Sequence, residues 1–197
     1  MKFKSEKLIE DLIERTRNAM NDVEALLLLS NEKLNQKSDA HSWSALECIA
    51  HLVFYSDFYN PEIKKRMDNS RSEPRPIFKS GLLGNFFSNL MLPKDNLNKM
   101  KTLKEANPLG SDLNKEILEK FKGQLKESLN LLNKARSKNL TKIKTGISIS
   151  NMIKLRLGDT FRVVIYHNQR HLIQALKAAG LPPEYNIDLL EEQSQIR

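Results

Sequence analysis

Apolar residues recur at spacings of three and four along several long stretches of the chain, a pattern typical of amphipathic helices. The first of these stretches runs from about Ser5 to Leu29. A later one begins at Ser111 or Asp112 and continues to about Lys138. We expect each to form a helix that buries one face.

The stretch that follows Trp43 has the clearest helix start in the chain. Ser44 and Glu47 have the spacing of a capping box, in which each side chain accepts a hydrogen bond from a backbone N–H left open at the helix start. Trp43 can pack on Cys48 as a hydrophobic staple. Residues 46–58 are apolar almost all round, which favours a central helix.

A fourth helix is predicted near the C-terminus, with Asp159 or Thr160 as its N-cap and Gly180 as its stop signal. His167 and His171 stand four residues apart and therefore share one face of this helix. The small apolar residues on the same face indicate that both histidines point into the core.

The segments between these helices are less regular. Residues 68–110 form a long connection that contains a short apolar helix at 82–92, and we expect this connection to act as a lid. The Phe86–Phe87 pair is equally suited to a homodimer contact. Residues 141–157 are expected to be a loop and residues 184–197 a tail. The pattern predicts one all-α domain over residues 1–197, a four-helix bundle in which the long connection permits parallel neighbours.

Composition narrows the class of protein. With 40% hydrophobic and 28% charged residues, the chain is globular rather than disordered. The single cysteine, Cys48, excludes an intramolecular disulfide and fits a reducing, cytoplasmic environment. No apolar run reaches the length of a membrane span and no signal-peptide pattern opens the chain, so no membrane partner is expected.

The net charge of +8 raises the question of an anionic partner. No acidic residue lies between Glu127 and Asp159, a stretch that carries several lysines and arginines. The same stretch has no aromatic residue for base stacking and matches no nucleic-acid-binding motif. We therefore interpret it as a solvated basic loop and do not expect nucleic acid as a partner.

Three of the four histidines are predicted to meet in the bundle core: His51 on the second helix, with His167 and His171 on the fourth. Metal sites in bundles are commonly built from side chains on facing helices. Three nitrogen ligands leave a position for water or substrate, the pattern of catalytic metal sites. The set suits zinc, nickel, copper or iron. The alternative is that these are hydrogen-bonded core histidines without a metal.

Two further residues are candidates for a catalytic role, although the sequence assigns none. Glu47 lies one turn before His51 and can accept a hydrogen bond from its imidazole, but the capping box already explains this residue. Tyr55 lies one turn after His51 and can donate to a bound substrate; the alternative is a core tyrosine. Asn168 stands where a zinc peptidase of the H-E-x-x-H type has its glutamate, so that mechanism lacks its base.

Two segments together resemble the DinB-like superfamily: Trp43-Ser44-Ala-Leu-Glu47-Cys-Ile-Ala-His51-Leu, and Tyr166-His167-Asn-Gln-Arg-His171-Leu-Ile-Gln174. This superfamily includes metal-dependent hydrolase-like proteins and transferases and isomerases that depend on bacillithiol or mycothiol. The resemblance implies a four-helix bundle that binds a divalent metal, commonly nickel or zinc, through His51, His167 and His171.

Two hypotheses of function follow. The first is a metal-dependent hydrolase or thiol S-transferase whose small-molecule substrate is activated at the metal, with water or a low-molecular-weight thiol as the nucleophile. The second is a non-catalytic bundle that binds a metal or small ligand and acts through a partner or as a homodimer.

Overall fold

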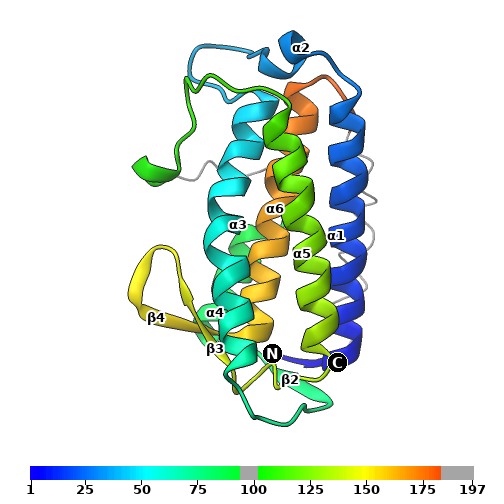
Figure 1. Ribbon diagram of the computed structural model, residues 1–197. Coiled ribbons are helices and arrows are strands. Elements are labelled where there is room, and N and C mark those ends of the chain that lie inside the picture. The colour runs from blue at the N-terminus through cyan, green and yellow to red at the C-terminus, as the bar shows by residue number, and fades with distance from the viewer. Residues whose placement is uncertain (94–101, 183–197) are drawn as a thin grey trace.

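The computed structural model describes residues 1–93 and 102–182, and four long helices dominate it (Figure 1). These are α1 (Ser5–Leu27), α3 (Ala45–Asp68), α5 (Glu116–Ala135) and α6 (Leu157–Ala178). The shorter helical elements are α2 (Asn31–Asn35), α4 (Leu82–Met91) and the 3-10 turn η1 (Lys104–Ala106). The predicted all-α bundle and the short apolar helix are confirmed, whereas the predicted tail at 184–197 lies outside the described residues.

The helices of the bundle run up, down, down and up along the chain (Figure 1). The helices α1 and α3 each pack against both α5 and α6. Ion pairs between Asp57 and Lys120, and between Asp68 and Lys134, show that α3 and α5 lie side by side and parallel. Their parallel arrangement requires the chain to return along the length of the bundle after α3. The long connection allows this return, which the sequence permitted without requiring it.

The start of α3 follows the capping prediction. Ser44 Oγ accepts a hydrogen bond from the backbone N–H of Glu47 at 3.2 Å, and Glu47 Oε2 accepts one from the N–H of Ser44 at 2.8 Å. In contrast, α5 begins at Glu116 and not at Ser111 or Asp112. The side chain of Asn114 accepts a hydrogen bond from the N–H of Glu116 at 2.9 Å, which ends the connection there.

The predicted cap of α6 is wrong. The helix begins at Leu157, and Asp159 is fully buried inside its first turn. The carboxylate of Asp159 instead accepts hydrogen bonds from Ser80 Oγ at 2.5 Å and from the N–H of Gly81 at 2.8 Å. Asp159 therefore joins α6 to the start of α4, a tertiary contact that local sequence cannot reveal.

Residues 141–157 are also not a simple loop. They contain the antiparallel strands β3 (Lys144–Ile147) and β4 (Ser150–Arg156), which form a hairpin beside α3. Ile143, Thr145 and Ile147 are buried while Lys144 is exposed, so the strand alternation is present but short. A second antiparallel pair joins β1 (Lys2–Lys4) to β2 (Ile77–Lys79). Among the described residues, no helix is long and apolar enough to cross a membrane.

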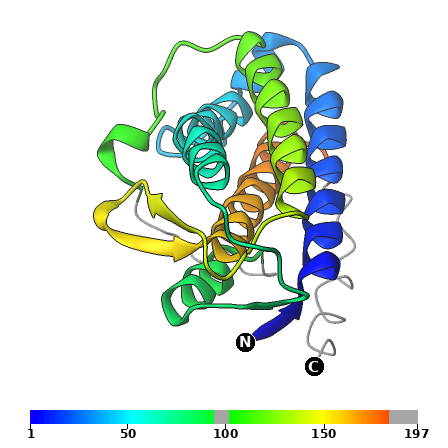
Figure 2. The ribbon, with the colours of Figure 1, turned by 60° about the horizontal axis from the view of Figure 1, so that its bottom comes forward.

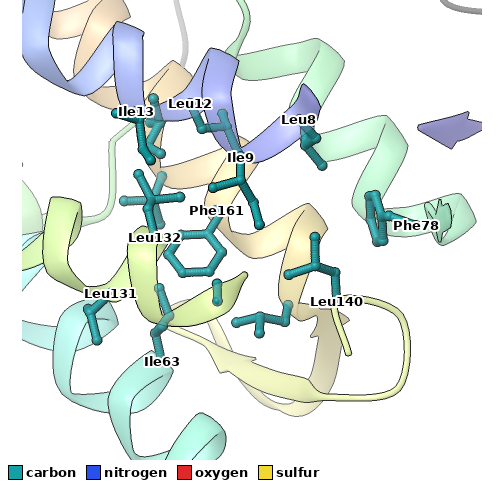
Figure 3. Packing of buried hydrophobic residues seen from close by; sticks show 14 of the residues in the cluster. Leu8, Ile9, Leu12, Ile13, Ile63, Phe78, Leu131, Leu132, Leu140 and Phe161 are labelled. Atoms are coloured by element: carbon teal, nitrogen blue, oxygen red, sulfur yellow. The ribbon is translucent and has the colours of Figure 1, made fainter. Parts of the chain in front are cut away.

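The hydrophobic core consists of two clusters, one toward each end of the bundle. Figure 3 shows the first, with Phe161 of α6 between side chains of α1 and α5 such as Ile9 and Leu132. On α6 this cluster ends at Tyr166, and the second begins at Leu172. Residues 167–171 therefore lie where the apolar core is interrupted.

Candidate metal centre

The three histidines predicted from the sequence lie between the two hydrophobic clusters, where the apolar core is interrupted. His51 projects from α3, and His167 and His171 project from successive turns of α6. One ring nitrogen from each of the three lies within 4.8 Å of the others. The Nε2 atoms of His51 and His167 are 3.2 Å apart. The expectation that these three side chains meet is confirmed.

Two of the three imidazoles are oriented by oxygen atoms that can only accept a hydrogen bond. His51 Nδ1 is 2.8 Å from the carbonyl oxygen of Ala106, and His171 Nδ1 is 3.0 Å from Gln174 Oε1. Both Nδ1 atoms must therefore carry the proton, which leaves the Nε2 lone pair of each ring free to bind a cation. Hydrogen bonds of this kind are the usual support of metal-binding histidines.

Burial keeps the three imidazoles neutral at physiological pH. It lowers the pKa of His51, and it lowers that of His171 to about 3, with the neighbouring His51 adding to the effect. The pKa of His167 is well below its usual value for the same reason, reinforced by His171 and His51. Because a metal binds the neutral imidazole, protons do not compete for these nitrogens near pH 7.

The donor set fits a borderline divalent cation. Such an ion binds imidazole nitrogen at about 2.0–2.1 Å, so ligands on adjacent positions stand roughly 3 Å apart, close to the His51–His167 separation. Without a cation, His167 must donate its Nε2 proton to His51, because the proton of His51 is on Nδ1. Within residues 1–93 and 102–182, no cysteine or carboxylate joins the three histidines.

Glu47 is engaged elsewhere. It is almost fully buried, and in addition to the capping bond its Oε1 accepts hydrogen bonds from Lys37 Nζ and from the N–H of Gly110, each at 2.6 Å. Burial alone would raise the pKa of this carboxyl, but the bonds from Lys37, Ser44 and Gly110 bring it below its usual value. Glu47 is therefore a fixed carboxylate, and Ala106 takes the place at His51 that was considered for it. A catalytic role for Glu47 stays a prediction.

Tyr55 lies beside the histidines. Its ring meets the rings of His51 and His167 edge-on, with both centroid distances 4.9 Å. Burial raises its pKa, and the nearby Tyr59 adds to this, so the phenol keeps its proton at neutral pH. The position suits a hydrogen-bond donor to a bound molecule, and that role stays a prediction.

The sequence did not identify two other parts of the site. The ring of Trp43 lies over the histidines, 4.8 Å from the ring of His51 and 5.8 Å from that of His171, centroid to centroid. Its Nε1–H donates to Asn107 Oδ1 at 3.1 Å. The sequence indicates Trp43 as a hydrophobic staple and as part of the resembling segment, but not as a neighbour of the histidines. The carbonyl of Ala106 has no sequence signal, because any residue could supply it.

The long connection contributes to the centre through its second half. The turn η1 ends at Ala106, against His51, whereas α4 packs on the first turns of α6, away from the three histidines. Residues 94–101, between these parts, lie outside the described residues. Movement of the connection as a lid stays a prediction.

The remaining histidine and the cysteine do not join the centre. His41 is exposed in the loop before α3. Cys48 is fully buried, and burial raises the pKa of its thiol far above the usual range, so it is a core residue.

Comparison with known proteins gives one match. The family model of the DinB superfamily matches residues 12–175, which is more than half of the chain and includes all three histidines. Neither the curated proteins nor the solved structures provide a match. By the extent of the family match, and in keeping with its helical bundle and histidine cluster, this chain belongs to the DinB superfamily.

Proposed function

We propose that this protein is a metal-dependent enzyme in which His51, His167 and His171 hold a divalent cation, with nickel and zinc as the first candidates. One observation carries the proposal: carbonyl oxygens accept the Nδ1–H of His51 and His171, so the Nε2 lone pair of each ring is left for a cation. Three protein nitrogens leave room on such a cation for a small molecule.

His51, His167 and His171 would hold the cation, which would supply the acidity that converts a bound water or thiol to its anion near neutral pH. This chemistry supports hydrolysis, or S-transfer from a low-molecular-weight thiol. The rings of Trp43 and Tyr55 border the histidines. Tyr55 keeps its proton and is placed to donate a hydrogen bond to a substrate or a departing group.

The first test is the metal content of untagged protein, measured by elemental analysis after incubation with nickel or zinc. We expect about one equivalent in the wild type and a loss in both His51→Ala and His171→Ala. His41→Ala is the matched control, because His41 is exposed outside the cluster. Equal metal content in all four proteins would disprove the three-histidine site.

A second candidate is a non-catalytic bundle that binds a metal or small ligand and acts through a partner or as a homodimer. It is supported by the carboxylate of Glu47, which three donors occupy, and by the absence of any other carboxylate from the cluster in the described residues. Screening the metal-loaded protein with electrophiles, with and without thiols, separates the two candidates. Turnover that His51→Ala abolishes favours the enzyme, and stoichiometric metal without turnover favours the binding protein.

A further inference from the structure

The outer face of α4 is apolar and uncovered. Leu82, Leu83 and Phe86 lie on this face, whereas Gly84 and Ser88 on the opposite face are buried against the start of α6. Leu82 is 95% exposed and Phe86 60%, values far from those of a core helix. Exposed apolar side chains that lie together on a protein surface indicate a site of contact with a membrane or another molecule.

The hairpin beside α4 carries a further exposed apolar side chain. The strand β4 packs next to α4, and its Met152 is 93% exposed. Figures 1 and 2 show α4, the hairpin and the β1–β2 pair at the same end of the bundle, where α6 begins. We call Leu82, Leu83, Phe86 and Met152 the α4 surface.

Four exposed lysines lie on the elements at the same end of the bundle as the α4 surface. Lys2 and Lys79 are direct cross-strand partners in the β1–β2 pair, and both are exposed. Lys79 is followed after two residues by Leu82, and Lys144 and Lys154 are exposed on the hairpin. Within the described parts of the chain, none of these four lysines has an ion pair. Like charges directly opposite one another are destabilising, so Lys2 and Lys79 favour an anionic surface.

Most acidic groups at this end of the bundle are held by other partners, and among the described residues the exposed Glu73 is the exception. Glu6 pairs with Arg136, and Asp68 pairs with Lys64 and Lys134. The carboxylate of Asp159 is buried against Ser80 and Gly81. The end of the bundle therefore combines projecting apolar side chains with unneutralised positive charge.

From this combination we propose that the α4 surface binds the face of an anionic phospholipid membrane, with Leu82, Leu83, Phe86 and Met152 entering the interface and the lysines contacting the headgroups. Projecting apolar side chains beside basic residues suit such a surface. A second copy of the chain fits less well, because a symmetric contact would bring Lys2 and Lys79 toward their own equivalents. This binding is peripheral, so it needs no membrane-spanning segment, and it replaces the sequence-based expectation of no membrane partner. It does not depend on the metal centre.

The test is flotation of the full chain with vesicles of phosphatidylcholine alone or with phosphatidylserine added. We expect binding to the phosphatidylserine vesicles at low salt, weaker binding at higher salt, and little binding to phosphatidylcholine alone. Replacing Lys2 and Lys79 by Gln should weaken binding about fivefold for each lysine. The pair Leu82→Ser and Phe86→Ser should weaken it about tenfold or more, because these side chains no longer enter the interface.

Two variants away from the α4 surface serve as controls. Leu28 is 86% exposed at the opposite end of the bundle, so Leu28→Ser matches the apolar substitutions. Lys126 is exposed on α5, so Lys126→Gln matches the charge substitutions. Both should bind vesicles like the wild type, and circular dichroism should show that all variants are folded.

Other results would overturn the proposal. Failure of the wild type to float with phosphatidylserine vesicles at low salt would do so. The proposal would also be overturned if the Leu82→Ser, Phe86→Ser variant bound these vesicles as strongly as the wild type. A dimer seen by analytical ultracentrifugation that the same variant abolishes would assign the surface to a second copy instead.

Discussion

The Nδ1 atom of His51 donates its proton to the carbonyl oxygen of Ala106, a residue 55 positions further along the chain, at 2.8 Å. One turn earlier on α3, Glu47 accepts a hydrogen bond from the N–H of Gly110, and just before the helix Trp43 donates one to Asn107. The start of α3 thus fastens the second half of the long connection. The orientation of His51 depends on that segment, which has no regular structure beyond the turn η1.

Removal of the Glu47 carboxylate should loosen this attachment. We expect Glu47→Ala to lower the free energy of unfolding by about 2–4 kcal/mol, because the helix loses its cap and buried donors lose a charged acceptor. Metal affinity should fall about 10–100-fold, the usual effect of disturbing the support of a ligand. Urea unfolding and a competitive metal titration measure the two effects.

Glu119→Ala, on the exposed side of α5, is the control for these two measurements. If Glu47→Ala lowers stability but leaves metal affinity unchanged, Ala106 does not need this attachment to orient His51. Glu47→Gln, which retains an acceptor oxygen for the cap, should recover part of both losses.

The stability of metal-free protein should fall as the pH is lowered below about 6.5, the ordinary pKa of histidine. In the folded state burial lowers the pKa of His171 to about 3, so between these values the unfolded chain binds a proton that the folded chain does not. The stabilisation is therefore present above pH 6.5 and is lost as the pH falls toward 3. Each such histidine contributes a slope of up to about 1.4 kcal/mol per pH unit.

Urea unfolding at pH 7 and pH 5, in the presence of a chelator, measures this loss. The decrease should be smaller in His171→Gln, by about 1–2 kcal/mol. An equal decrease in the wild type and the variant would show that His171 is not the group that titrates.

Trp43 should report metal binding directly, because it is the single tryptophan of the chain and its ring lies 4.8 Å from that of His51. Paramagnetic Ni²⁺ or Cu²⁺ at the three histidines should quench most of its fluorescence, whereas Zn²⁺ should bind without strong quenching. Titration of the emission measures the affinity. His41→Ala should behave like the wild type and His51→Ala should not respond; quenching that persists in His51→Ala would place the metal elsewhere.

Two glycine substitutions should have opposite effects on stability. A Cβ atom at Gly84 would overlap the side chain of Asp159, so Gly84→Ala should destabilise the protein by about 1–3 kcal/mol as α4 moves away from α6. Gly123 lies on α5 with open space around it, so Gly123→Ala should stabilise by about 0.5–1 kcal/mol. Thermal unfolding compares the two, and a neutral Gly84→Ala would contradict the packing of α4.

Local sequence signals predicted the helices well, but they did not predict the contacts between segments that are distant in the sequence. The capping box at Ser44 was recognised because all its atoms lie within one turn. The role of Asp159 was missed because its partners, Ser80 and Gly81, lie far away in the sequence. The β3–β4 hairpin was missed because its alternation covers few residues and the basic composition resembled a loop.

By itself the sequence determined the four helices, the bundle class and the identity of the three candidate ligands. Helical periodicity and the spacing of His167 and His171 are local properties of the sequence. Only the tertiary structure decided that Ala106 orients His51, that Glu47 fastens the connection, and that α4 leaves Leu82 uncovered. Backbone carbonyls are identical in every residue, and exposure depends on which elements pack together. Both are set by contacts between segments that are distant in the chain.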